Sequence, residues 1–214
     1  MAVSMTFNSL LSDMKKYLER GTAVDPSVFE QLPSLINLAE RELANRLKIL
    51  GFVRVVTDTF GVGMSVVPKP DRWRDTISIN FGVGTEQVRT QLFARSYEYS
   101  RRYWPDEDIT DQPKFYADYD YFNWLIVPTP DLAYPFEVNY WELPALLDNT
   151  NQTNWTTDFA PNSLLHGALL QATPFLKNDE RIPIWEAIYE KDVAILEAQD
   201  MKRIIDRNVT RGSV

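Results

Sequence analysis

Helical periodicity occupies both ends of this chain, and strand-like alternation occupies its middle. Near the two ends, apolar residues recur every three or four positions, as in amphipathic helices that bury one face. The predicted helical stretches are residues 6–20, 26–48, 161–176 and 179–206. A chain with this order of patterns is expected to be an α+β protein, because helices from both ends and strands from the middle must each bury an apolar face.

The middle of the chain is predicted to be a mostly antiparallel β domain, because its segments alternate and are rich in β-branched and aromatic residues. The predicted strands are residues 52–60, 64–67, 76–81, 116–127 and 134–141. The first two flank a Gly-Val-Gly turn and are expected to pair with each other as a hairpin. Between Glu86 and Arg102 we expect a short helix followed by an irregular strand.

The returning helices are expected to pack on the starting ones. The predicted fold class is therefore α+β, with a helical bundle formed by both chain ends and an inserted, mostly antiparallel β domain. The predicted boundaries are 1–50 and 160–206 for the helical domain, 51–145 for the β domain, 146–159 for a linker and 207–214 for a flexible C-terminal tail.

Composition excludes several kinds of chemistry. The chain has no cysteine, one histidine and a formal net charge of −8. Without cysteine there is no disulfide framework, iron-sulfur cluster or thiolate nucleophile, and one histidine cannot supply the imidazoles of a usual catalytic zinc site. The acidic balance gives no basic footprint for reading nucleic acid.

Targeting and membrane signals are not evident either. Residues 1–20 lack the basic start and the continuous apolar core of a signal peptide, so we expect the protein to stay in the cell that makes it. No apolar run approaches the 18 or so residues that a membrane span needs. We therefore expect no contact with a membrane.

Candidate catalytic and metal-binding groups fail simple tests. The acidic stretch Asp106–Asp111 lacks the glycine and the final glutamate of a calcium-binding loop. Asp118 and Asp120 could form a carboxylate pair, but a polar outward strand face, with the neighbouring tyrosines inward, is the preferred interpretation. His166 lies in an apolar run and is interpreted as a core or interface residue. We therefore predict no catalytic, cofactor-binding or metal-binding residues and no enzyme activity.

Aromatic residues are concentrated in one part of the β domain. About half of the chain's aromatic residues lie between Tyr97 and Trp141. Because alternation cannot hide all of them on one face, some are expected at the surface, where Tyr and Trp are typical of protein interfaces. A sugar-stacking platform is the alternative. The arginines at positions 95, 101 and 102 could serve the edge of the core or anchor an interface.

Four segments carry a family resemblance. They are SLINLAERELANRL (34–47), RSYEYSRRYW (95–104), the aromatic segment from PKFYADYDYF to NYWELP (113–144), and PNSLLHGALLQATPFLKNDERIPIWEAIYE (161–190). Together they resemble the head-to-tail adaptor, or connector, proteins of tailed bacteriophages. The helical segments containing LLHGAL and FLKNDER carry the resemblance furthest.

The resemblance implies a structural virion protein, without cofactors, that is assembled in the host cytoplasm and located in the neck of the particle. It implies a homo-oligomeric ring, commonly a dodecamer, that joins the portal protein to tail tube, nozzle or terminator proteins. DNA would pass through the lumen without sequence recognition, and an acidic wall would not hold it. A carbohydrate-binding or receptor-binding tail protein is the alternative function, and a two-carboxylate glycosidase ranks last.

The resemblance also suggests where contacts lie, because in such adaptors the helical layer and C-terminal tail face the portal. The candidate portal contacts are Lys202, Arg203, Arg207 and Arg211. The candidate contacts with other subunits or with the tail are Tyr119, Tyr121 and Trp124.

Overall fold

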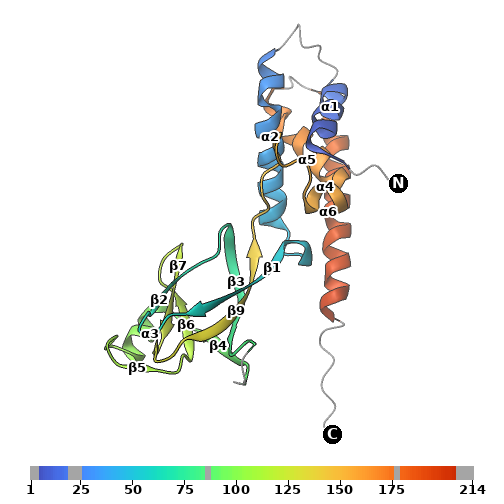
Figure 1. The fold of residues 1–214 in the computed structure, drawn as a ribbon. Helices are drawn as coiled ribbons and strands as arrows, with labels where there is room; N and C mark the ends of the chain where they lie inside the picture. The colour runs from blue at the N-terminus through green and yellow to red at the C-terminus, as the bar shows by residue number, and fades with distance from the viewer. Residues whose placement is uncertain (1–4, 19–25, 85–87, 176–178, 206–214) are drawn as a thin grey trace. The chain divides into compact units, whose positions relative to one another are not determined.

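The computed structural model describes residues 5–18, 26–84, 88–175 and 179–205 (Figure 1). It confirms the α+β class: six α-helices accompany a large, curled, mixed sheet. The chain divides into two compact units. Unit 1 spans Met1–Phe52 and Leu143–Val214, and unit 2 spans Val53–Glu142.

Unit 1 holds five of the α-helices. They are α1 (Phe7–Leu18), α2 (Pro26–Arg46), α4 (Trp155–Phe159), α5 (Pro161–Gln171) and α6 (Ile182–Ile205), with short 3-10 turns at Leu50–Phe52 and Thr173–Phe175. Helix α2 includes Pro33 within its length. Helix α1 buries one face, which consists of Phe7, Leu10, Met14 and Leu18.

Helix α5 contacts every other α-helix of this unit. Residues 163–169 are buried in succession, so α5 is buried around most of its circumference. At Gly167 an added Cβ would lie 3.1 Å from the ring of Tyr189 in α6 and 3.5 Å from Ala39 in α2. This glycine therefore permits the close packing of α5 on both neighbours. Arg46 of α2 also donates two hydrogen bonds, of 2.7 and 2.6 Å, to Glu190 of α6.

A buried carboxylate joins α2 to the segment that precedes α4. Glu40 has no exposed surface. It accepts hydrogen bonds from the Leu147 backbone N–H (3.0 Å), the Asn154 side-chain amide and the Thr156 hydroxyl (3.5 Å). Asn154 also caps α4 through its side chain. The segment that we predicted as a linker, 146–159, contains helix α4 and buried residues. It supplies the hydrogen-bond donors that the buried Glu40 carboxylate needs.

Unit 2 is built on a seven-stranded sheet with the order β1-β9-β3-β4-β6-β7-β2. Its strands are β1 (Val53–Phe60), β2 (Val66–Pro68), β3 (Trp73–Phe81), β4 (Thr90–Ala94), β6 (Phe115–Asp118), β7 (Asn123–Val127) and β9 (Tyr134–Glu142). The short strands β5 (Thr110–Asp111) and β8 (Thr129–Pro130) form a second sheet. In the large sheet β4 and β6 pair in parallel, and the other neighbours pair antiparallel.

The sheet has to curl because its two edge strands follow one another in the chain. Only residues 61–65 separate β1 at one edge from β2 at the other. The predicted hairpin of these strands is therefore wrong: β1 pairs along its whole length with β9, and β2 pairs with β7. For β1, pairing with β9 is preferred to pairing with β2, because β9 is longer than β2 and has a buried apolar face.

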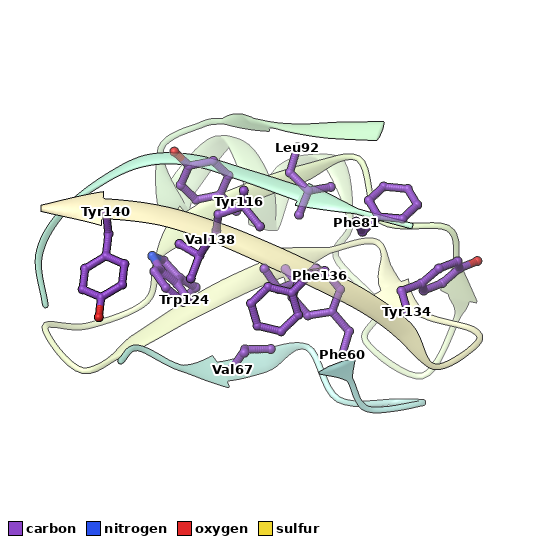
Figure 2. Packing of buried hydrophobic residues seen from close by; sticks show 12 residues of the cluster. Phe60, Val67, Phe81, Leu92, Tyr116, Trp124, Tyr134, Phe136, Val138 and Tyr140 are labelled. Atoms are coloured by element: carbon purple, nitrogen blue, oxygen red, sulfur yellow. The ribbon is translucent and has the colours of Figure 1, made fainter. Parts of the chain in front are cut away.

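An aromatic core fills the inside of the curl (Figure 2). The rings of Phe60 and Phe136 stack with centroids 4.1 Å apart. The Trp124 ring is fully buried, and its indole N–H donates to the Thr76 hydroxyl at 3.0 Å. The remaining members are Val67, Ile79, Phe81, Leu92, Tyr116, Ile126, Tyr134, Val138 and Tyr140. Because every strand of the large sheet contributes a side chain, this core holds the sheet closed.

Candidate functional site

The candidate site of unit 2 is built on α3 (Tyr97–Tyr103), a helix that follows β4 and contacts β6 and β7. This order reverses the prediction of a helix followed by a strand between residues 86 and 102. Ser96 caps the helix by accepting the Tyr99 N–H at 3.2 Å. Ser100 is buried, and its hydroxyl donates to the Ser96 carbonyl at 3.0 Å. With Ser100 inward, the tyrosines of α3 lie partly at the surface.

One arginine lies against two rings of this surface. The Arg95 guanidinium is 5.4 Å from the centre of the Tyr99 ring and 5.5 Å from that of Phe115. The Tyr103 ring stacks on Tyr99 at 6.2 Å and meets Phe115 edge-on at 5.0 Å. These contacts hold Arg95 in place through attraction between the cation and the ring faces.

A second arginine, Arg101, repeats the arrangement six residues further along the chain. The Arg101 guanidinium lies 5.3 Å from the Tyr97 ring and 5.9 Å from the Tyr119 ring. Its Nε–H donates to the Tyr97 hydroxyl at 3.2 Å, and it also pairs with Glu107. The rings of Tyr97 and Tyr119 are in contact as well, which joins α3 to the end of β6.

We call this set the tyrosine-arginine surface. Its members are Arg95, Tyr97, Tyr99, Arg101, Tyr103, Phe115 and Tyr119. The four tyrosines are each between 40% and 44% exposed. Within the part of the chain that the structure describes, neither Arg95 nor the neighbouring Arg102 has a carboxylate partner. The surface therefore combines ordered rings with unpaired positive charge on an acidic protein, a composition typical of protein interaction hot spots.

The turn from β6 to β7 extends the aromatic area. Its two aromatic side chains are more exposed than the tyrosines of the tyrosine-arginine surface, with Tyr121 at 61% and Phe122 at 73%. Asp120 holds the turn by accepting the backbone N–H groups of Phe122 (2.6 Å) and Asn123 (2.8 Å). Hydrogen bonding from the Asn123 side chain lowers the pKa of Asp120 below its ordinary value, so the carboxylate stays ionised in this role.

The carboxylates considered as a catalytic or cation-binding pair have local roles. Asp118 pairs with the Lys69 ammonium at 2.7 Å. That ammonium lies 3.7 Å from the centre of the Trp73 ring. Asp120 holds the turn, as described above. Among the described residues there is no group of three or more carboxylates and imidazoles that could bind a metal ion.

The three residues predicted for subunit or tail contacts divide into two groups. Tyr119 and Tyr121 are exposed, whereas the preferred interpretation had placed them inward. The reason is that β6 ends at Asp118, so the predicted strand 116–127 is in fact two strands and a turn. Trp124 lies at the start of β7 and is fully buried. It therefore supports the core rather than forming part of the surface.

Comparison with known protein families decides the identity of the chain. A sequence model of the SU10 adaptor protein family matches residues 5–212. The chain belongs to the SU10 adaptor protein family. Comparison with curated proteins gave no match. The family name marks a phage adaptor, which is a structural component of the virion and not an enzyme.

The four basic residues predicted to contact the portal lie at or beyond the end of α6. Lys202 and Arg203 belong to the last turn of that helix. Arg207 and Arg211 lie outside the described residues, as does the predicted tail 207–214. The portal assignment of this adaptor therefore stays a prediction.

The one histidine of this SU10 adaptor family member lies in helix α5. His166 is buried, and its Nδ1 lies 2.8 Å from the Asn162 carbonyl oxygen, so the ring is engaged within α5. No helix in the described part of the chain has the length and apolar character to cross a bilayer.

Sequence reasoning missed Tyr97, Tyr99 and Tyr103 as individual site residues. The signal was their spacing: Tyr99 and Tyr103 are four residues apart, as are Tyr97 and Arg101. Side chains at that spacing meet on one face of a helix. The spacing becomes informative only when residues 97–103 are assigned to a helix.

Proposed function

We propose that this adaptor forms a dodecameric ring that joins the portal to tail components and continues the DNA channel. The observation that carries the proposal is the family match over residues 5–212. In this proposal the helices of both chain ends form one portal-proximal bundle, and the β domain faces outward or toward the tail. Lys202, Arg203, Arg207 and Arg211 contact the portal. Capture of the chain by purified portal, compared with a variant in which these four residues are glutamate, tests that contact.

The tyrosine-arginine surface supports the role of the β domain as a contact region. Interfaces of this kind are anchored by Tyr and Arg side chains that rest in a fixed position before binding. Arg95 and Arg101 are each held by two rings, so little side-chain entropy is lost when a partner binds. The surface therefore suits a neighbouring subunit or a tail protein that presents carboxylates.

The same geometry makes the tyrosine-arginine surface itself a poor platform for a sugar. A sugar stacks on the open face of an aromatic ring, but guanidinium groups already lie over the rings of Tyr97, Tyr99 and Tyr119. The net charge of −8 per copy agrees with a DNA conduit, because an acidic wall repels phosphates.

Disrupting the surface is expected to impair assembly without unfolding the chain. The double change Arg95→Glu and Tyr99→Ala should weaken the contact by about 2 kcal/mol or more, roughly thirtyfold in affinity. The measurement is the yield of tailed particles when the variant complements a phage that lacks the gene. The melting temperature should stay close to that of the unmodified chain. Val88→Ser, at a strongly exposed position outside the surface, is the control and should assemble normally.

A further inference from the structure

Strand β1 leaves one long edge of the large sheet unpaired. The strand runs for eight residues, pairs with β9 alone and ends the strand order on that side. Within the described chain, its outward backbone groups bind no other strand, and the Thr59 N–H donates to the Asp58 side chain at 2.7 Å. The opposite edge differs, since β2 has only three residues and ends on Pro68.

Both faces of β1 are open as well. All residues from Arg54 to Thr59 are exposed, although the residues opposite them on β9 include the buried Phe136 and Val138. Phe60 is therefore the residue of β1 that belongs to the core, and the side chains of Arg54 to Thr59 lie outside it. Val55 is 57% exposed and Val56 39% exposed, on opposite faces of the strand.

Natural sheets usually protect such an edge with proline, lysine, a bulge or a very short strand. The sequence of β1, VRVVTDTF, contains neither proline nor lysine, and its pairing with β9 is continuous, without a bulge. It is rich in β-branched residues, which favour an extended conformation. An edge with these properties is suited to receive another strand.

The charges of β1 identify the strand that fits. Arg54 and Asp58 are its only charged residues, and they lie two positions before and two positions after Val56. When two copies of β1 run antiparallel with Val56 opposite Val56, each Arg54 faces the Asp58 of the other copy. Opposite charges that face each other across strands stabilise the pairing. Asp58 has no cationic partner among the described residues and accepts only the Thr59 N–H, at 2.7 Å. Arg54 pairs through its Nε–H with Glu142 of its own chain at 2.9 Å, so in the proposed pair its guanidinium would bind both carboxylates.

We propose that two copies of this chain pair through their β1 edges, antiparallel, across a two-fold axis at Val56. This pairing is independent of the proposed adaptor function. Two copies related by a two-fold axis face in opposite directions, whereas neighbours in a closed ring face the same way. The β1 pair therefore belongs to the free protein, in which it covers the unpaired edge, and is not the contact between ring neighbours.

Single cysteines test the register directly, because the chain has none of its own. In the proposed pair the two residues at position 56 are directly opposite, with Cα atoms about 4.5–5.5 Å apart, within the range of a disulfide. Two residues at position 55 are diagonal neighbours at about 7–8 Å, beyond that range. Under mild oxidation Val56→Cys should form a covalent dimer and Val55→Cys should remain a monomer. Equal cross-linking of the two variants, or none, would overturn the proposal.

Charge exchange provides a second test, which loss of folding cannot mimic. Arg54→Asp places aspartates opposite each other in its own pair, and Asp58→Arg places arginines opposite each other. Each variant alone should dimerise at least roughly tenfold more weakly than the unmodified chain by sedimentation velocity. Mixed together, the two variants restore both opposite-charge contacts and should form a heterodimer. Glu186→Arg is a matched charge change on the exposed surface of α6 and should leave dimerisation unchanged. A mixture that stays monomeric would contradict the pairing.

Discussion

Replacing Trp124 with alanine is expected to lower the free energy of unfolding by about 3–5 kcal/mol, the usual cost of removing a large buried ring. The ring has no exposed surface and lies inside the curl of the sheet among side chains from neighbouring strands (Figure 2). Its removal leaves a cavity that the curled sheet cannot easily close, and it also leaves the Thr76 hydroxyl without this donor. Urea denaturation followed by circular dichroism measures the change.

Tyr121→Ala is the matched control for Trp124→Ala. Tyr121 is only three residues away, but its ring is 61% exposed. Its replacement should change the free energy of unfolding by no more than about 0.5 kcal/mol, as is usual at exposed positions. If both variants were equally stable, Trp124 would not occupy the core position described above. The pair of measurements therefore separates the residue that supports the fold from the one at the surface.

Glu40→Ala is expected to destabilise unit 1 by about 2–4 kcal/mol. The change removes the acceptor for three donors: the Leu147 N–H, the Asn154 amide and the Thr156 hydroxyl. The Leu147 N–H loses its acceptor, whereas the Thr156 hydroxyl keeps Asn154 Oδ1 at 2.5 Å and the Asn154 amide keeps the Ala145 carbonyl at 3.2 Å. The lost hydrogen bonds to a carboxylate and the unpaired Leu147 N–H together exceed the gain from removing a buried charge. Thermal unfolding followed by circular dichroism, with Glu30→Ala at an exposed position of the same helix as control, measures the effect.

The pH dependence of the Glu40 contribution follows from its burial. Burial raises the pKa of Glu40 above its ordinary value of 4.5, although its hydrogen bonds partly oppose the shift. Between 4.5 and the raised pKa, the folded chain holds a proton that the unfolded chain has released. The stability of the unmodified chain relative to Glu40→Gln should therefore fall as pH rises through this window and then level off. A relative stability that rises with pH would contradict the buried position of this carboxyl.

Elements with a local apolar pattern could be predicted from sequence. Helix α1 lies within the predicted stretch 6–20, and β9 coincides with the predicted strand 134–141 to within one residue. Strand pairing could not be predicted in the same way. The turn between residues 60 and 64 suggested a hairpin, but the partner of β1 lies about eighty residues further along the chain. Alternation indicates which face of a strand is buried and does not indicate which strand lies beside it.

The candidate surface was only partly predictable for a similar reason. Aromatic density located it between residues 97 and 141, but exposure depends on where each strand ends. Tyr121 and Trp124 are three residues apart, one outside and one inside, because the Asp120 carboxylate stops β6 and closes a turn. Asp120 and Asn123 are residue types that favour turns, and they were the available signal for that break.

Electron microscopy of the chain mixed with the purified portal protein of the same phage tests the adaptor function most directly. The proposed function predicts closed rings of this chain, twelvefold and stacked on the portal, with a central channel that continues through both proteins. The Arg95→Glu and Tyr99→Ala variant distinguishes the role of the β domain surface from that of the portal contacts. A chain that is not captured by the portal and forms no ring with it would contradict the proposed function.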